Sequence, residues 1–235
     1  MHLLPPVQMQ YVFAVGLAVG FAVPASSADI ELPAIVVQGQ VSKPPDIVLK
    51  DREERSPDVH WPTALSIRWS EIFAHNAIDI NASCATVWNH LIQAYLWSQW
   101  CPDVGKVRVT NKDGSQTLRM NTRFTWSGFD LGLDTIALPA FQVDPPFASK
   151  VNEYVPESRL GWVSYTTAVT PWGPVCDAYH NWLLTPTSAN KCHVVLEAVA
   201  TGLGARRARG NYPEIAHMSH QRWLEDLKRA SENHG

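Results

Sequence analysis

Residues 183–201, LLTPTSANKCHVVLEAVAT, carry the clearest structural signal in the chain. Two β-rich runs, 177–185 and 192–201, flank the turn-forming residues Pro-Thr-Ser-Ala-Asn, and this pattern predicts a β-hairpin. A basic loop follows, and apolar residues at helical spacing then predict an amphipathic helix over 211–233. A long hairpin that leads into a long C-terminal helix favours a sheet curved around that helix, and such a sheet can enclose a pocket.

Regular patterns upstream of the hairpin begin near residue 71. Residues 72–82 alternate as a strand, and Asn81 or Ser83 can then cap a helix that runs to about residue 97. Further strands are predicted at 106–110, 117–126, 150–155 and 159–167, whereas 131–147 is ambiguous because it contains three prolines. This order of elements predicts the α+β class, with a curved antiparallel sheet of about seven strands around the C-terminal helix.

The first 28 residues contain no Asp, Glu, Lys or Arg, and residues 11–23 form an apolar run. Small residues follow at the positions that a signal peptidase reads before a cut after Ala28. This pattern predicts a signal peptide over 1–28, too short to span a bilayer, and therefore export to the periplasm or beyond. Because no Lys or Arg precedes the apolar run, a buried hydrophobic N-terminal element remains the alternative.

Residues 29–70 contain five prolines and the charge run Asp-Arg-Glu-Glu-Arg at 51–55. They predict a proline-rich extended tether, which leaves 71–235 as the folded domain. In an exported chain, the four cysteines at positions 84, 101, 176 and 192 can form disulfides. Four cysteines allow three pairings, and the sequence does not rank them.

Composition narrows the range of partners. The net charge is −3 and the pI is about 6.3, so nothing favours nucleic acid or an anionic membrane surface as a partner. No Cys-x-x-Cys pair, metalloprotease motif, phosphate-binding loop or dinucleotide fingerprint is present, so we expect no metal and no cofactor. Ten tryptophans are many for 235 residues, and they can form either a Trp-rich core or the walls of an apolar pocket.

Several short motifs, in this order, carry a resemblance to a known superfamily. They are IDINA with TVW at 78–88, WCPDV at 100–104, VNEYVP through RLGW at 151–162, HNWLLTP at 180–186, Glu197 with Gly202, and WLEDLKRASE at 223–232. Residues 72–233 thus resemble the START/Bet v 1-like superfamily, also called SRPBCC or the polyketide cyclase/dehydrase and lipid-transport superfamily. The resemblance implies a helix-grip fold with an internal cavity, and one departure from it is the proline-containing stretch 131–149.

Candidate catalytic residues come from the hairpin and the last helix. If the turn pairs Trp182 with His193, then His180 and Glu197 share the concave face and can act as an acid/base pair, whereas a one-residue slip separates them. The alternative is a structural His180 with Glu197 in solvent. His220 is the polar residue on the apolar stripe of the last helix. It is predicted to point into the pocket, with a place at the edge of the core as the alternative.

Candidate ligand-binding residues are aromatic: Trp100, Trp126, Trp162, Trp182 and Trp223 as apolar walls, and Tyr165 as a hydroxyl donor. The cluster Arg-Arg-Ala-Arg at 206–209 can clamp an anionic ligand at the pocket mouth, with an exposed loop as the alternative. The function predicted first is a carrier or sensor that binds a small hydrophobic lipid, polyketide or aromatic molecule. The alternatives are a cyclase or dehydratase and an interaction module with a closed core, which a pocket below about 300 Å³ would favour.

Overall fold

The computed structural model describes residues 35–37, 40–42, 46–128, 147–166, 169–170, 173–174 and 176–233. The predicted signal peptide, 1–28, and nearly all of the ambiguous stretch 131–147 lie outside these residues. The statements below refer to the described residues.

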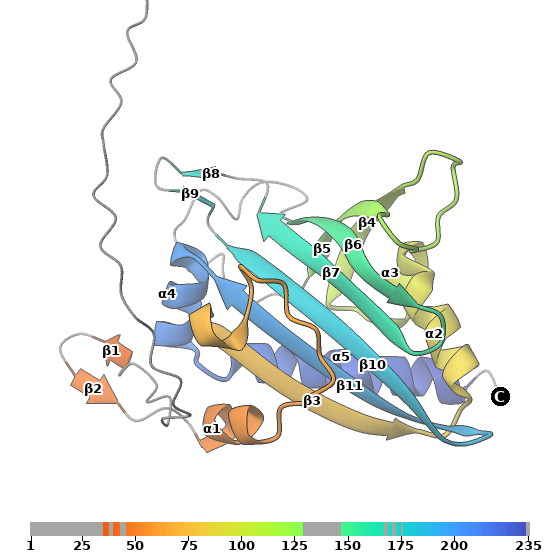
Figure 1. Ribbon diagram of the computed structural model, residues 1–235, viewed down its shortest axis with the longest axis horizontal. Helices are drawn as coiled ribbons and strands as arrows, with labels where there is room; N and C mark the ends of the chain where they lie inside the picture. The colour runs from red at the N-terminus through yellow and green to blue at the C-terminus, as the bar shows by residue number, and fades with distance from the viewer. Residues whose placement is uncertain are drawn as a thin grey trace, which may run out of the picture. The chain divides into compact units, whose positions relative to one another are not determined.

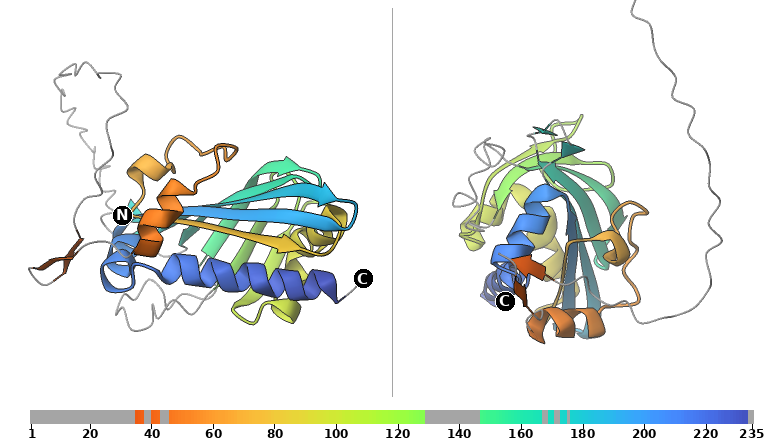
Figure 2. Two further views of the ribbon diagram at one scale, coloured as in Figure 1. Left: turned by 90° about the horizontal axis from the view of Figure 1, so that it is seen from below. Right: turned by 90° about the vertical axis from the view of Figure 1, so that its left-hand side faces the viewer.

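A seven-stranded antiparallel sheet forms the main layer (Figure 1), with the strand order β3-β11-β10-β7-β6-β5-β4. Its strands are β3 (Ile72–Ile80), β4 (Val104–Thr110), β5 (Arg123–Gly128), β6 (Phe147–Val155), β7 (Arg159–Thr166), β10 (Asp177–Ser188) and β11 (Lys191–Thr201). The C-terminal helix α5 (Ile215–Glu232) runs along the concave side of the sheet (Figure 2). The predicted α+β helix-grip arrangement is therefore confirmed.

Shorter elements complete the domain. The helices are α1 (Asp46–Glu53), η1 (Ile67–Trp69), α2 (Cys84–Ile92), η2 (Ala94–Leu96), α3 (Trp97–Trp100) and α4 (Leu203–Asn211). Two small strand pairs join β1 (Ile35–Val37) to β2 (Gln40–Ser42) and β8 (Val169–Thr170) to β9 (Gly173–Pro174). The basic loop expected at 206–209 is thus part of a helix, α4.

Local signals explain the start of α2 but not its end. Ser83 caps the helix, because its side chain accepts a hydrogen bond from the backbone N–H of Thr86. The helix was predicted to continue to about residue 97, but α2 ends at Ile92 because Gln93 leaves the helical region, with φ −84° and ψ 58°. The chain turns there through η2 and α3, which positions Trp97 in the core.

The register of the β10–β11 hairpin decides between the two facings considered for Glu197. Trp182 lies opposite Leu196 and His180 opposite Ala198, so Trp182 does not pair with His193, and the facing present is the alternative one that separates His180 from Glu197. Both strands extend further into the turn than expected, with an irregularity after Pro186, and only Ala189 and Asn190 remain between them. Because side chains alternate along a strand, this register decides which residues face α5.

The concave face of the hairpin is apolar apart from one histidine. Its residues are Ala178, His180, Trp182 and Leu184 from β10, with Cys192, Val194, Leu196 and Ala198 from β11. They pack against Trp223, Leu224 and Leu227 of α5, which are fully buried. Alternation then places Tyr179, Asn181 and Glu197 on the convex face.

A folded segment covers the convex face, and residues 46–70 are called the N-terminal cover below. Its helix α1 packs on β3, and Val59 and Leu65 are buried against the sheet. The ring of Trp61 lies edge-on to those of Phe73 and Tyr179, at 6.0 and 5.8 Å between centroids. The extended conformation expected for this part of the chain is therefore wrong, because its scattered apolar residues bury the apolar convex face of β3, β10 and β11.

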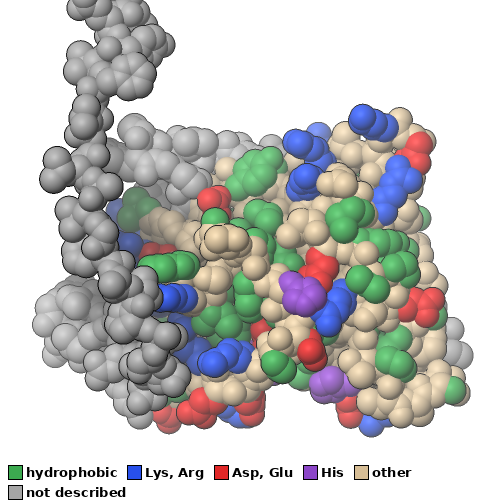
Figure 3. Space-filling view, viewed as in Figure 1, with side chains coloured by type: hydrophobic (Ala, Val, Ile, Leu, Met, Phe, Trp, Pro, Cys, Tyr) green, Lys and Arg blue, Asp and Glu red, His purple; other side chains and the backbone are tan. Residues whose placement is uncertain are grey.

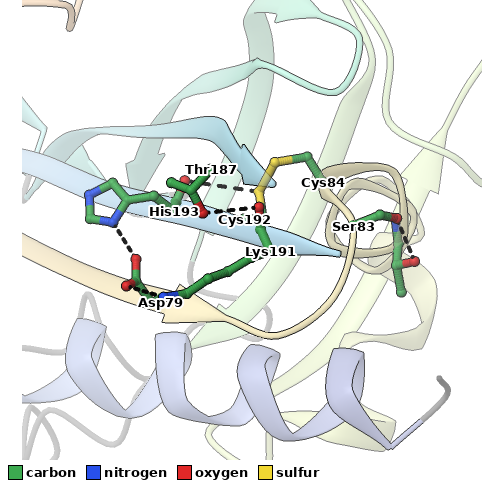
Figure 4. Close-up of a disulfide and its surroundings, with 8 residues drawn as sticks. Asp79, Ser83, Cys84, Thr187, Lys191, Cys192 and His193 are labelled. Carbon is green, nitrogen blue, oxygen red and sulfur yellow. Dashed lines mark hydrogen bonds and ion pairs between the residues drawn. A yellow bond between two sulfur atoms is a disulfide. The ribbon is translucent and has the colours of Figure 1, made fainter. Parts of the chain in front are cut away.

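A disulfide joins Cys84, at the start of α2, to Cys192, at the start of β11 (Figure 4). Cys101 and Cys176 are free thiols. The bond links an edge of the helical layer to the hairpin, across a sequence separation of 108 residues. The two partners come together only when β11 pairs with β3, which opposes Cys192 to Ile80 a few residues before Cys84.

Candidate functional site

A cavity of about 90 Å³ lies between the sheet and helices α4 and α5. Its walls come from Ile72, Trp126, Gly128, Phe147, Cys176, Ala178, His180, Ala198, Val199, Ala200, Gly204, Ala205, Ala208, Ile215, Ala216, Ser219 and His220. Most of these side chains are small and apolar, so the cavity exists because alanine and glycine stand where larger residues would fill the core. Two of the three predicted catalytic residues, His180 and His220, are on its wall.

His180 of β10 and His220 of α5 meet edge to face, with ring centroids 5.3 Å apart. The His180 ring also stacks on Trp162 at 5.4 Å, and its Nδ1 has no hydrogen-bond partner among the described residues. Burial lowers the pKa of His180 to about 4. Burial, followed by the nearby His180 and His217, lowers the pKa of His220 well below its usual value. Both rings are therefore neutral at pH 7.

The protein should lose stability in acid because of His180. Its pKa falls from 6.5 in the unfolded chain to about 4 in the fold, so the unfolded state binds the proton first. The full free energy of unfolding is present above pH 6.5. It should decrease by about 3 kcal/mol as the pH falls to 4, because only the unfolded chain takes up the proton over this range. Urea unfolding at several pH values should show a shallower pH dependence for His180→Leu than for the wild type. The same slope in both would contradict this assignment, and His193→Leu, at a half-buried histidine away from the cavity, is the control.

Five tryptophans fill the interior of the curved sheet: Trp97, Trp126, Trp162, Trp182 and Trp223. Trp223 lies edge-on to Trp182 and Trp97, at 5.1 and 5.4 Å between ring centroids. Of these five, only Trp126 is part of the cavity wall. The tryptophans predicted as pocket walls at 162, 182 and 223 are instead packed in the core, beside the cavity.

Two further predicted ligand residues lie away from the cavity. Trp100 borders a separate hollow of about 240 Å³ next to His90 and Gln93. Tyr165 is 44% exposed and lies on the convex side, beside a groove of about 510 Å³ with Leu65 and Val163. Tyr165 alternates with the inward residues of β7, so its expected place in the pocket is wrong.

Glu197 lies on the opposite face of the sheet from His180, so the expected acid/base pair is wrong. It is fully buried beneath the N-terminal cover, not in solvent. Its carboxylate lies 2.7 Å from Nδ1 of His75 and accepts a hydrogen bond from the backbone N–H of Ser56. Glu197 therefore connects two strands and the N-terminal cover, and it is remote from the cavity histidines.

A row of polar residues crosses the convex face through Glu197. Strand pairing places His75, Glu197, Asn181, Gly161 and Glu153 side by side on five strands. The Asn181 amide donates to Glu153 at 2.6 Å. A Cβ at Gly161 would come within 2.4 Å of the hydroxyl of Tyr179, which also donates to Glu153. The sequence did not predict this row, because each strand contributes only one of its residues and the pairing of the five strands brings them together.

Three solved structures illustrate what this chain is similar to. A hypothetical protein from Helicobacter pylori matches 75% of this chain and 98% of its own, with a TM-score of 0.62 and 19% identity. An aromatase/cyclase from Streptomyces matches 69% of this chain and 92% of its own, with a TM-score of 0.46 and 12% identity. Norcoclaurine synthase from Thalictrum flavum matches 69% of this chain and 87% of its own, with a TM-score of 0.47 and 10% identity.

The chain has an α+β helix-grip fold. The first of these structures shares this fold over nearly its whole length. No family model matches the sequence, and no curated protein does. The fold therefore agrees with the resemblance seen in the sequence motifs, and the similarity extends to the fold alone.

Among the described residues, no three His, Cys, Asp or Glu side chains come together as a metal site. His217, three residues before His220, pairs with Asp51 at 2.8 Å. No helix in the described part of the chain is long and apolar enough to cross a membrane. Acidic and basic side chains are interspersed on the face seen in Figure 3.

Proposed function

We propose that the protein binds a small, largely apolar molecule in the cavity beside His180 and His220. The observation that carries the proposal is an apolar cavity wall with a buried, neutral His180 whose Nδ1 has no hydrogen-bond partner among the described residues. An unpartnered polar group in a core costs about 1–3 kcal/mol, and a ligand hydroxyl or amine can recover that free energy. The apolar wall would bind the rest of the molecule.

The size of the cavity limits the occupant. Its volume of about 90 Å³ is several times what one water needs. It is below the range of about 300–1,000 Å³ that is usual for drug-sized ligands. A single aromatic ring or a short alkyl chain is the proposed occupant, and a whole lipid or polyketide is not. Because so small a cavity also suits a closed interaction module, the experiment must separate these two functions.

Binding is favoured over a cyclase or dehydratase reaction. A general base works best with a pKa near the working pH, whereas that of His180 is about 4. No carboxylate is among the described residues that line the cavity, and Glu197 lies across the sheet. The wall thus offers hydrogen bonds from neutral histidines but no group poised to exchange a proton at pH 7.

Filling the cavity should weaken binding strongly. Ala198 is buried on the cavity wall, so Ala198→Leu places a larger side chain in the space, whereas Ala77→Leu, on the exposed side of β3, leaves it open. Ligand-observed NMR with phenol and toluene should show binding to the wild type and to Ala77→Leu. Ala198→Leu should bind at least about tenfold more weakly, a loss of 1.4 kcal/mol or more. Absence of binding to the wild type, with no molecule found by native mass spectrometry, would favour the closed interaction module.

We further propose that the protein acts outside the cytoplasm. The predicted signal peptide supports this, and so does the Cys84–Cys192 disulfide, because such bonds persist in oxidising compartments. Its partners there would be the small ligand alone, since charge and motifs favour neither nucleic acid nor a membrane.

A further inference from the structure

A groove of about 510 Å³ lies on the convex side of the sheet, away from the cavity. The N-terminal cover contributes Pro62, Ala64 and Leu65 to its lining, and the other lining residues come from β7, β10 and β11. Figure 1 views the sheet from this side, with the segment that follows α1 lying over it. The volume is within the range of about 300–1,000 Å³ that is usual for small-molecule sites.

Strand pairing places three groove residues next to one another on the convex face. Asp177 of β10 lies directly opposite Tyr165 of β7 on one side, and directly opposite Thr201 of β11 on the other. Residues directly opposite on antiparallel strands point to the same face, with Cβ atoms about 4.5–5.5 Å apart. A carboxylate, an aromatic ring and a hydroxyl therefore lie side by side, and all three residues line the groove.

The carboxylate of Asp177 has no ionic partner in the fold. Its side chain makes no hydrogen bond or ion pair with any described residue. No Lys, Arg or His is among the described residues that line the groove. Burial raises the pKa of Asp177, because partial removal from water disfavours the charged form. The groove thus contains a partly desolvated negative charge that no ion pair neutralises.

The rest of the groove is mainly apolar. Apart from Asp177 and two threonines, its described lining residues are Pro62, Ala64, Leu65, Val163 and Tyr165. The tyrosine is 44% exposed, so its ring is accessible to a ligand. An apolar lining with a single negative charge is complementary to a molecule that has an apolar body and one positive charge.

We propose that this groove binds a small organic amine, with its ammonium group at Asp177 and its apolar body against Leu65 and Val163. An alkylammonium has three donors and no acceptor. The Asp177 carboxylate can accept one of them in a charge-assisted hydrogen bond, and the Thr201 hydroxyl can accept another. The ring of Tyr165 can attract the same cation through its π electrons. Because the groove lies across the sheet from the cavity, this site does not rest on the proposed function.

Benzylamine and benzyl alcohol are the matched probes, since they differ in charge but hardly in shape. In NMR titrations at pH 7, benzylamine should bind the wild type at least about tenfold more tightly than benzyl alcohol does. Asp177→Asn should remove this advantage and leave the alcohol unaffected. It should melt no lower than the wild type, because the Asp177 side chain has no hydrogen bond or ion pair to lose. Tyr165→Leu should weaken benzylamine by about two- to fivefold.

Two further variants serve as controls. Asp58→Asn removes an exposed aspartate of the N-terminal cover that does not line the groove, so it should leave benzylamine binding unchanged. Ala198→Leu fills the cavity and should also leave it unchanged. Equal affinities of the wild type for the amine and the alcohol, or equal losses in Asp177→Asn and Asp58→Asn, would overturn the proposal.

The same titrations separate this site from the proposed function. A loss of benzylamine binding in Ala198→Leu but not in Asp177→Asn would place the amine in the cavity, and it would therefore overturn the proposal for the groove. If phenol and toluene do not bind but benzylamine depends on Asp177 as expected, the groove site holds and the proposed function alone fails.

Discussion

Replacing both Cys84 and Cys192 with alanine should lower the free energy of unfolding by about 4–5 kcal/mol. The bond spans 108 residues of sequence, so it removes a large amount of conformational entropy from the unfolded chain. Its loss should also loosen the start of α2 from β11, since no other covalent link joins these described elements (Figure 4). Urea denaturation of the purified protein, with and without a reducing agent, measures the difference.

The free thiols provide the control for this prediction. Cys176→Ser changes a partly exposed thiol and should stay within about 1 kcal/mol of the wild type. Alkylation followed by mass spectrometry should find two free thiols before reduction and four after, because Cys101 and Cys176 are unpaired. A double alanine variant as stable as the wild type, or four thiols without reduction, would show that the bond does not form.

Replacing Glu197 with leucine should destabilise the protein by about 3 kcal/mol. The carboxylate is fully buried, so its loss leaves His75 and the backbone N–H of Ser56 without their acceptor inside the structure. The N-terminal cover should then detach more readily, because the Ser56 contact holds its middle. Urea denaturation measures the first effect, and the rate of limited proteolysis within residues 46–70 measures the second.

Asp79 is the matched control for Glu197. It also contacts a histidine, His193, at 2.9 Å, but its side chain is 51% exposed. Water screens an exposed pair, so Asp79→Leu should have a small effect and leave proteolysis of the N-terminal cover unchanged. Equal losses of stability and equal rates of proteolysis in the two variants would contradict the prediction that burial makes the Glu197 contacts stronger than those of Asp79.

Local patterns were sufficient for the main elements of the fold. Alternation at 72–82 and 159–167 predicted β3 and β7, and helical spacing after Pro213 predicted α5, because these periods reflect which face is buried. The N-terminal cover was not predicted, because its apolar residues show no such period. Val59, Trp61 and Leu65 are apolar residues without a period, and their burial depends on a sheet formed by residues far away in sequence.

Which predicted residues belong to the candidate site depended on how the strands pair more than on residue type. His180 and His220 could be named from the hairpin and the helix stripe, and both line the cavity. Glu197 could not be placed, since a change in hairpin register moves it from one face to the other. Arg209 was visible as part of a basic cluster, but the sequence did not place that cluster on a helix, α4.

The sequence by itself therefore determined the α+β class, the long hairpin, the terminal helix and three of the cavity residues, Trp126, His180 and His220. Each of these follows from contacts or periods within a short stretch of chain. Only the tertiary structure decided the cysteine pairing, the face of Glu197 and the packing of the tryptophans in the core. These depend on strand register and on contacts between distant segments, for which no local pattern exists.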